Sequence, residues 1–240
     1  MNALSPDLLD ALEVALVELT ADKAVRALVI TGAGRAFCAG ADLAFALDSL
    51  SYGSSGDALF SFVERAGAVL DRVASFPKPV IAAVNGLALA GGLELVLCCD
   101  LVVATESARL GDAHANYGLL PGAGGAVRLA RRIGANRAKQ LLFTGELVTA
   151  GSLVEAGLVN AVVPDGELEA AADALANKIA EKSPLSHASM KRLVDEGLEQ
   201  PLEAALRLEV EALKTHLDSH DVREGLAAFR EKRKPRFEGR

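Results

Sequence analysis

Two glycines and a glutamate, Gly91, Gly92 and Glu94, stand where an apolar run leaves a predicted strand and turn and enters a predicted helix. The first amides of a helix have no partner inside it, and the positive end of the helix dipole lies behind them. These amides could therefore stabilise a negative charge that develops on an oxygen atom. The Glu94 carboxylate stands beside them as a candidate acid or base.

A cluster of small residues at 37–43 (F-C-A-G-A-D-L) forms a second candidate segment, because small side chains let the backbone approach a ligand closely. The glycines at 32–34 (G-A-G) that precede it could open a dinucleotide fingerprint. No third glycine follows in register and no helix opens there, so we interpret this segment as a turn. Residues 44–57 are rich in serine and glycine and are expected to form a loop.

His114 is a third candidate, twenty residues after Glu94 in the segment L-G-D-A-H. Histidine exchanges protons near neutral pH, so a Glu94/His114 pair could activate water and protonate a carbon atom. If the segment is extended, Asp112 and His114 share a face and Asp112 could orient the imidazole. Three alternatives remain open: His114 as a hydrogen-bonded pocket wall, Asp112 as a capping or solvated residue, and Glu94 as a buried structural carboxylate.

The predicted strands lie in the first two thirds of the chain and helices alone fill the last third. This order predicts an α/β core over residues 1–183 and a helical C-terminal region over 184–240. Apolar runs predict strands at 27–31, 80–84, 101–104 and 160–164. Helical spacing and caps predict helices at 5–20, 59–75, 127–133, 137–143, 150–156, 168–182, 184–196, 202–217 and 219–232.

The composition excludes several classes of protein. Of the 240 residues, 51% are hydrophobic and 24% charged, which suits a large packed core. A net charge of −7 argues against a nucleic-acid partner. No apolar run is long enough to cross a bilayer and no signal peptide is visible, so no membrane partner is expected. Three cysteines in apolar settings indicate reduced core residues of a cytoplasmic protein, without a disulfide or metal.

Several motifs in a fixed order resemble the enoyl-CoA hydratase/isomerase (crotonase) superfamily over essentially the whole chain. The segments are 25–43 (V-R-A-L-V-I-T-G-A-G-R-A-F-C-A-G-A-D-L), 77–95 (P-K-P-V-I-A-A-V-N-G-L-A-L-A-G-G-L-E-L), 118–134 (G-L-L-P-G-A-G-G-A-V-R-L-A-R-R-I-G), 142–164 (L-F-T-G-E-L-V-T-A-G-S-L-V-E-A-G-L-V-N-A-V-V-P) and 223–237 (R-E-G-L-A-A-F-R-E-K-R-K-P-R-F). The resemblance implies an α/β fold built as a spiral of ββα turns, with roughly perpendicular sheets and a C-terminal helical region used in trimerisation. It also implies a homotrimer or a dimer of trimers.

The resemblance implies an acyl-CoA thioester as substrate, held by its carbonyl oxygen between two backbone N–H groups. Matched residue by residue, these oxyanion-hole donors are Ala41 and Gly91. Backbone around Ala39 and Leu43, with Asp42 between Ala41 and Leu43, is implied to bind the substrate's CoA adenine. Coenzyme A enters with the substrate, so no separate cofactor is expected.

Family hydratases use two carboxylates, and here the pattern departs. Glu94 matches the first, whereas His114 stands at the second position. The resemblance implies an enoyl-CoA hydratase of fatty acid metabolism with a Glu94/His114 pair. Three alternatives stay open: an isomerase that uses Glu94 alone, a C–C bond hydrolase that uses His114 and Asp112, and a non-catalytic acyl-CoA binder.

The N-terminal end of the chain differs from the family pattern, and the C-terminal end carries a basic tail. An initial β-hairpin and a basic residue that meets CoA phosphates normally precede the segment N-A-L-S, which here lies at residues 2–5. We therefore expect that hairpin to be missing and a sheet edge to need cover. Phosphate binding would then depend on the basic tail, whose cations are Lys232, Arg233, Lys234, Arg236 and Arg240.

Overall fold

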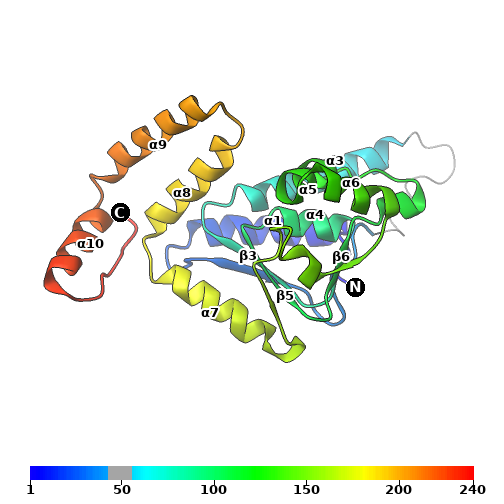
Figure 1. The fold of residues 1–240 in the computed structure, drawn as a ribbon, viewed down its shortest axis with the longest axis horizontal. Coiled ribbons are helices and arrows are strands. Elements are labelled where there is room, and N and C mark those ends of the chain that lie inside the picture. Colours follow the sequence, from blue (N-terminus) through cyan, green and yellow to red (C-terminus); the bar gives the residue numbers. More distant parts are fainter. Residues whose placement is uncertain (43–55) are drawn as a thin grey trace.

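The computed structural model describes residues 1–42 and 56–240 (Figure 1). Its helices are α1 (Pro6–Ala21), α3 (Asp57–Ala74), α4 (Gly91–Leu97), α5 (Gly125–Ile133), α6 (Ala135–Thr144), α7 (Leu168–Ala180), α8 (Pro184–Gly197), α9 (Leu202–His216) and α10 (His220–Glu231), with 3₁₀ turns η1 (His114–Tyr117), η2 (Ala150–Leu153) and η3 (Asp165–Glu167). Its strands are β1 (Leu28–Thr31), β2 (Ala36–Cys38), β3 (Val80–Val84), β4 (Leu87–Leu89), β5 (Leu101–Thr105), β6 (Arg109–Gly111), β7 (Val148–Thr149) and β8 (Ala161–Val163).

The strands form two sheets that the chain visits in turn. The first sheet has the order β1-β3-β5-β8 and all its pairs are parallel. The second has the order β2-β4-β6-β7, with only β6 and β7 antiparallel. Each unit of two strands places the first strand in one sheet and the second in the other, and a helix follows. This arrangement confirms the predicted spiral of ββα turns.

Strand β3 lies at the centre of the molecule and is buried on both faces. Val80, Ala82 and Val84 belong to the main core, whereas Ile81 and Ala83 pack in a second cluster with Leu168 and Ala172 of α7. A parallel strand covered on both faces needs apolar residues at every position, which explains its unbroken apolar run. Figure 1 shows α7 covering the β3/β5 side opposite α4 and α5.

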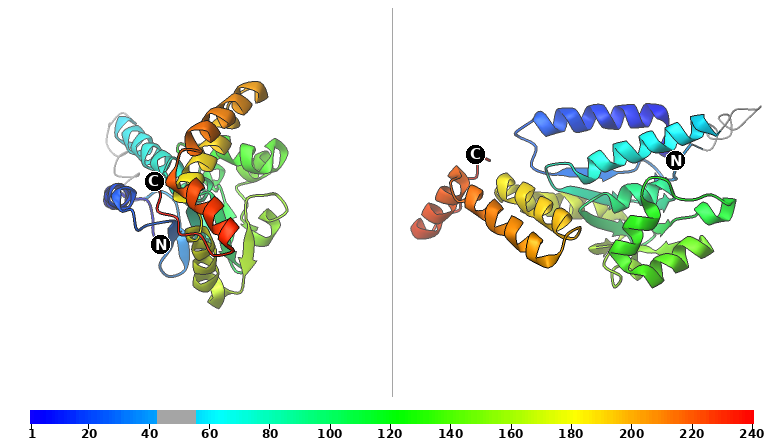
Figure 2. Two further views of the ribbon diagram at one scale, coloured as in Figure 1. Left: turned by 90° about the vertical axis from the view of Figure 1, so that its left-hand side faces the viewer. Right: turned by 90° about the horizontal axis from the view of Figure 1, so that it is seen from above.

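Helices α1 and α3 lie side by side on the outside of the core (Figure 2, right). The Ser5 side chain caps α1 by accepting the Leu8 amide, and Pro6 stands at the first helical position, as predicted. Arg65 and Arg72 of α3 form ion pairs with Asp10 and Glu13 of α1. Those pairs are exposed, so buried apolar contacts hold the two helices in place.

Helices α8, α9 and α10 extend away from the sheets (Figures 1 and 2). No side chain of α8 or α9 is buried. The chain end returns along α10, where the buried Asp221 carboxylate accepts hydrogen bonds from Ser183 and from the amides of Glu238 and Gly239. Large apolar side chains remain exposed on these helices: Met190, Val194, Leu198, Leu202, Leu206, Val210, Leu213, Leu226 and Phe229.

Most predicted elements are confirmed, with one clear error. The helix predicted at 150–156 is wrong: a single 3₁₀ turn, η2, is followed by non-helical turns. The predicted loop at 44–57 falls almost entirely outside the described residues. The three cysteines are free and buried, as expected. Among the residues described, no helix is long and apolar enough to cross a membrane.

The N-terminus of α4 packs directly on the backbone of β2. A methyl group added at Gly92 would lie 2.0 Å from the carbonyl oxygen of Cys38, which is closer than any real contact. Because the obstacle is backbone rather than a flexible side chain, the two elements cannot separate locally to make room. Only glycine fits at position 92.

We therefore expect Gly92→Ala to destabilise the protein by about 3 kcal/mol, the size of a severe overpacking effect. Urea unfolding followed by circular dichroism measures this change. Gly166→Ala is the matched control, because a methyl group there meets no atom within 4 Å. Equal stability of the two variants would contradict the packing described here.

Candidate active site

Two glycine-flanked bends meet at one end of the second sheet. A methyl group added at Gly91 would lie 3.5 Å from the amide nitrogen of Ala41. One added at Gly40 would lie 3.4 Å from the amide nitrogen of Gly91. The two predicted oxyanion-hole donors, Ala41 and Gly91, therefore stand close together although fifty residues of sequence separate them.

The backbone pattern around Ala41 sets the direction of its N–H group. Leu4 forms a parallel bridge with Ala41: the Leu4 amide donates to Gly40, and the Asp42 amide donates to the Leu4 carbonyl. Because successive amides alternate in direction along an extended chain, the N–H group of Ala41 points away from Leu4. Among the described residues, it takes no part in the bridge.

Ala90 controls the direction of the Gly91 amide on the other side. Ala90 precedes α4 with φ 48° and ψ −116°, a backbone conformation that residues other than glycine seldom adopt. Its amide donates to Gly111 and its carbonyl accepts from Glu94. Gly91 is then the first residue of α4, where an amide has no partner inside the helix. Strain of this kind is often found beside functional sites.

Glu94 is buried, with 3% of its surface exposed, and its carboxylate is held from one side. The amides of Ala123 and Gly125 both donate to Oε1, at 2.8 and 2.9 Å. Gly125 is the first residue of α5, so the carboxylate also caps that helix. Two hydrogen bonds from N–H groups satisfy a charge that an apolar core would otherwise reject.

His114 and Asp112 form the predicted pair, but not through an extended segment. Ala113 adopts a left-handed conformation and His114 begins the 3₁₀ turn η1. Asp112 Oδ1 lies 3.0 Å from Nδ1 of His114 and also accepts the His114 amide at 3.2 Å. The left-handed residue turns the two side chains toward each other. Within the described residues, the buried Asp112 Oδ2 has no hydrogen-bond partner.

The charges around His114 favour its protonated form. Burial alone would lower the pKa of His114, but the hydrogen bond to Asp112 and the negative charges of Asp112 and Glu94 raise it above its ordinary value. The charge of Glu94 therefore contributes to the pKa of His114, so the two side chains interact electrostatically.

The residues predicted to bind CoA are only partly described. The Ala39 amide donates to the Met1 carbonyl and the Asp42 amide to Leu4, so both already have partners. Leu43 lies outside the described residues. CoA binding at these positions remains a prediction.

The basic tail is partly neutralised within the chain. Arg233 forms a two-pronged ion pair with Glu224 and a further pair with Glu231. The hydrogen bonds from Arg233 and from the Arg236 amide lower the pKa of Glu224 to about 2. Arg240 pairs with Glu238. The predicted role of this tail in phosphate binding stays untested.

Sequence reasoning missed three residues of this site: Ala90, Ala123 and Gly125. The glycine-rich turn at 121–125 was a visible signal, but its amides could not be connected with Glu94 before the fold was known. The conformation of Ala90 left no signal, because alanine does not predict a positive φ.

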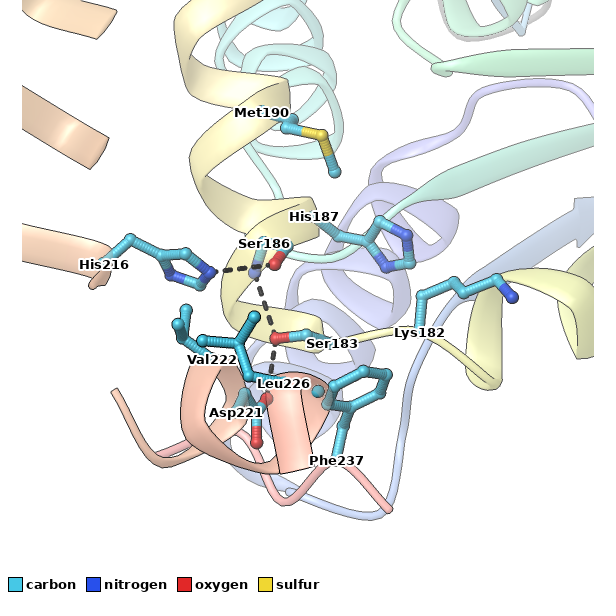
Figure 3. Close-up of a pocket in the computed structure, with 11 residues that line it drawn as sticks. Lys182, Ser183, Ser186, His187, Met190, His216, Asp221, Val222, Leu226 and Phe237 are labelled. Carbon is cyan, nitrogen blue, oxygen red and sulfur yellow. Dashed lines mark hydrogen bonds between the residues drawn. The ribbon is translucent and has the colours of Figure 1, made fainter. Parts of the chain in front are cut away.

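A cavity of about 440 Å³ lies apart from these residues, between the start of α8 and helix α10 (Figure 3). It contains the Ser186–His216 hydrogen bond of 3.0 Å and the Ser183–Asp221 bond of 2.6 Å. None of the predicted site residues lines it.

Comparison with known proteins gives consistent matches over the full chain. A family model described as enoyl-CoA hydratase/isomerase matches residues 1–240. The crotonyl-CoA hydratase of Syntrophomonas wolfei is 38% identical, over 99% of this chain and 90% of that protein. The short-chain-enoyl-CoA hydratase of Clostridium acetobutylicum is 36% identical, over 98% and 88%. The crystal structure of an enoyl-CoA hydratase from Bacillus anthracis superposes with a TM-score of 0.94 at 39% identity, over 99% and 91%, and confirms the predicted fold class.

The Asp112–His114 contact predicts a measurable titration. In Asp112→Asn the pKa of His114 should fall, because burial remains while the neighbouring charge is lost. A raised histidine pKa stabilises the fold fully below the unfolded-state value of about 6.5, and this contribution is lost as the pH rises through the folded-state pKa. The stability difference between wild type and variant should therefore be larger at about pH 5 than at about pH 8.

Proton NMR titration of the imidazole signals measures the first effect, and urea unfolding at the two pH values measures the second. The signal of His216, which is distant in sequence and bonded to Ser186, serves as an internal reference. An unchanged or higher pKa of His114 in the variant would contradict the assigned contact.

Proposed function

Because the chain belongs to the enoyl-CoA hydratase/isomerase family, we propose that it adds water across the double bond of a 2-enoyl-CoA. One observation supports the proposal most strongly. Glu94 is buried and hydrogen-bonded, and it belongs to the same helix start as Gly91, whose amide nitrogen lies near the amide nitrogen of Ala41. Amides so placed suit a thioester oxygen, and the carboxylate suits proton transfer at the neighbouring carbons.

The amides of Ala41 and Gly91 would stabilise the enolate that hydration forms. As water attacks the β-carbon, the electrons of the double bond move to the thioester oxygen, which becomes negative. Two fixed N–H donors in a site without bulk water stabilise that charge without reorganising. Each such donor typically contributes about 3 to 4 kcal/mol to lowering the barrier.

Glu94 and His114 would divide the proton transfers. The Glu94 carboxylate accepts a proton from water as the oxygen bonds to the β-carbon. The His114 imidazolium, supported by Asp112, donates a proton to the α-carbon as the enolate collapses. The product gains one water in total, and a proton passes from Glu94 back to His114 through solvent before the next cycle. The raised pKa of His114 supports this role, because it favours the protonated imidazole.

The reaction needs no separate cofactor, because adding water to an alkene transfers no net electrons. Coenzyme A enters as part of the substrate. We place the reaction in the cytoplasm on the basis of three free, buried thiols.

We also propose that the chain acts as a homotrimer or a dimer of trimers. The apolar side chains exposed along α8, α9 and α10 support self-association, because so many large apolar groups are seldom left in water. Residues 184–240 would form this helical assembly region, and residues 1–183 would hold the acyl-CoA site.

The Asp112–His114 hydrogen bond favours a second candidate, the hydrolysis of a C–C bond in a β-dicarbonyl acyl-CoA. There His114 would accept a proton from water, which attacks a ketone carbonyl, and the released carbanion would be stabilised as the thioester enolate. This candidate needs a neutral imidazole, so its rate should fall at low pH. The raised pKa of His114 therefore favours hydration.

Replacing Glu94 by glutamine tests the proposed hydration most simply. Glutamine keeps an oxygen that accepts the amides of Ala123 and Gly125, but it cannot take up a proton. We expect kcat for crotonyl-CoA to fall roughly 10²- to 10⁴-fold. Loss of enoyl absorbance measures the rate, and Glu106→Gln, an exposed glutamate, is the control. A Glu94→Gln variant with the wild-type rate would exclude this mechanism.

Heavy water separates hydration from isomerisation and simple binding. In deuterium oxide, hydration should give a 3-hydroxyacyl-CoA with one deuterium on the α-carbon, detected by mass spectrometry. In His114→Ala that product should form at least 10²-fold more slowly. Deuterium exchange without added water would indicate an isomerase, and tight binding without any product would indicate a non-catalytic binder.

A further inference from the structure

We propose that Arg128 is a positioning residue for Glu94, acting through the turn formed by residues 121–125. The inference rests on the function proposed above, in which Glu94 accepts a proton. It assigns to Arg128 the task of fixing which carboxylate oxygen is bonded to the protein and which is left to exchange protons.

Arg128 bridges the turn and helix α3. Its Nη1 donates to the carbonyl oxygen of Ala123 at 2.8 Å, and its Nη2 donates to Asp71 of α3. Its own amide donates to the carbonyl of Gly124 at 2.9 Å, as part of α5. The guanidinium is therefore fixed at two points and the backbone of the residue at a third, and the turn lies between the guanidinium and Glu94.

Ala123 connects the two side chains directly. Its carbonyl oxygen accepts from Arg128, and its amide donates to Glu94 Oε1 at 2.8 Å. A shift of this residue would move its amide and, through the chain, that of Gly125. The position of Arg128 thus determines whether both amides reach the same oxygen.

Gly124 lets the guanidinium lie against the turn. Gly124 has φ +96°, and a methyl group added there would lie 2.1 Å from Nη1 of Arg128. Gly125 is also restricted, though less severely, because a methyl group there would lie 2.9 Å from Cβ of Pro121 and 3.0 Å from Glu94 Oε1. The guanidinium, the turn and the carboxylate are stacked with no room for a side chain between them.

Both amides donate to Oε1, so the lone pairs of that oxygen are occupied by hydrogen bonds. Oε2 accepts neither of these bonds and is the oxygen we assign to proton exchange. If the turn moved, the carboxylate could rotate and present either oxygen. General-base catalysis depends on this geometry, and a misplacement of about 1 Å can cost roughly 10²-fold in rate.

The positive charge of Arg128 also interacts with Glu94. Three groups share an electrostatic interaction with Glu94: Arg128, His114 and the thiol of Cys98. Burial raises the pKa of Cys98 to about 11, so that thiol is neutral at physiological pH. Asp71 forms an ion pair with Arg128. Removing Arg128 therefore removes a cation that favours the charged carboxylate, while the imidazolium of His114 remains.

The ion pair between Arg128 and Asp71 does not by itself explain why the Arg128 side chain lies against the turn. The Asp71 side chain is 67% exposed, and exposed pairs contribute little to stability. Arg72, the next residue on α3, forms a comparable exposed pair with Glu13 but contacts no part of the turn. Arg72 is therefore a matched control for the loss of one arginine–carboxylate pair.

The experiment compares Arg128→Met, Arg128→Lys, Arg72→Met and Glu94→Gln in the full-length protein. For each, kcat and KM for crotonyl-CoA are measured across pH, together with the melting temperature. We expect Arg128→Met to lower kcat roughly 10- to 100-fold with little change in KM, and to move the acid limb of the kcat/KM profile to higher pH. Arg128→Lys should restore the acid limb but only part of kcat, and Arg72→Met should match wild type.

A crystal structure of Arg128→Met gives a readout that does not depend on activity. We expect at least one of the two amide distances to Glu94 Oε1 to exceed hydrogen-bonding range. Two intact hydrogen bonds would overturn the proposal whatever the kinetics. A lower melting temperature with an unchanged pH profile and unchanged kcat would also overturn it, because it would show a merely structural role.

The failure of this proposal differs from the failure of the proposed function. If Glu94→Gln is inactive while Arg128→Met has normal kcat and pH profile, only the role of Arg128 is wrong. If Glu94→Gln keeps the wild-type rate, the proposed role of Glu94 in hydration is wrong, and the crystal structure still decides whether Arg128 holds the turn. If no variant and no wild-type protein hydrates crotonyl-CoA, the proposed function itself is wrong.

Discussion

The close contact between two backbone bends is the constraint on which the rest of the site depends. Residues 38–41 and 90–92 approach so closely that side chains are excluded between them: a methyl group on Gly92 would collide with Cys38. Sheet pairing between β2 and β4 and the start of α4 together produce this approach. The result is that the amide nitrogens of Ala41 and Gly91 lie near each other, although fifty residues of sequence separate them. The spiral of ββα turns thus brings the two bends together.

The second requirement is that a carboxylate buried in an apolar core finds hydrogen-bond donors. Glu94 meets it by joining three elements: it belongs to α4, accepts amides at the start of α5, and lies beside a turn that Arg128 connects to α3. Charge-assisted hydrogen bonds offset the loss of water around the carboxylate. His114 is hydrogen-bonded to Asp112, and that carboxylate favours the protonated form of the imidazole. In the proposed hydration, Glu94 would accept a proton and His114 would donate one.

Local patterns were enough to predict the long elements and the central part of the site. The unbroken apolar run of β3, the cap at Ser5 and the glycines before α4 all report on local backbone preferences. Contacts through space were harder to predict. The short strands β2, β6 and β7 exist because of their partners. The link from Arg128 to Glu94 passes through Ala123 and depends on how α5 packs on α4. The Asp112–His114 pair was predicted for the wrong reason, since it needs the left-handed backbone of Ala113.

The central claim is that the amides of Ala41 and Gly91 share one thioester oxygen. The most direct measurement is a crystal structure of the protein with butyryl-CoA, a saturated thioester that cannot be hydrated. We predict that its carbonyl oxygen lies within about 3.2 Å of both amide nitrogens. A thioester oxygen bonded to only one of them, or to neither, would contradict the account.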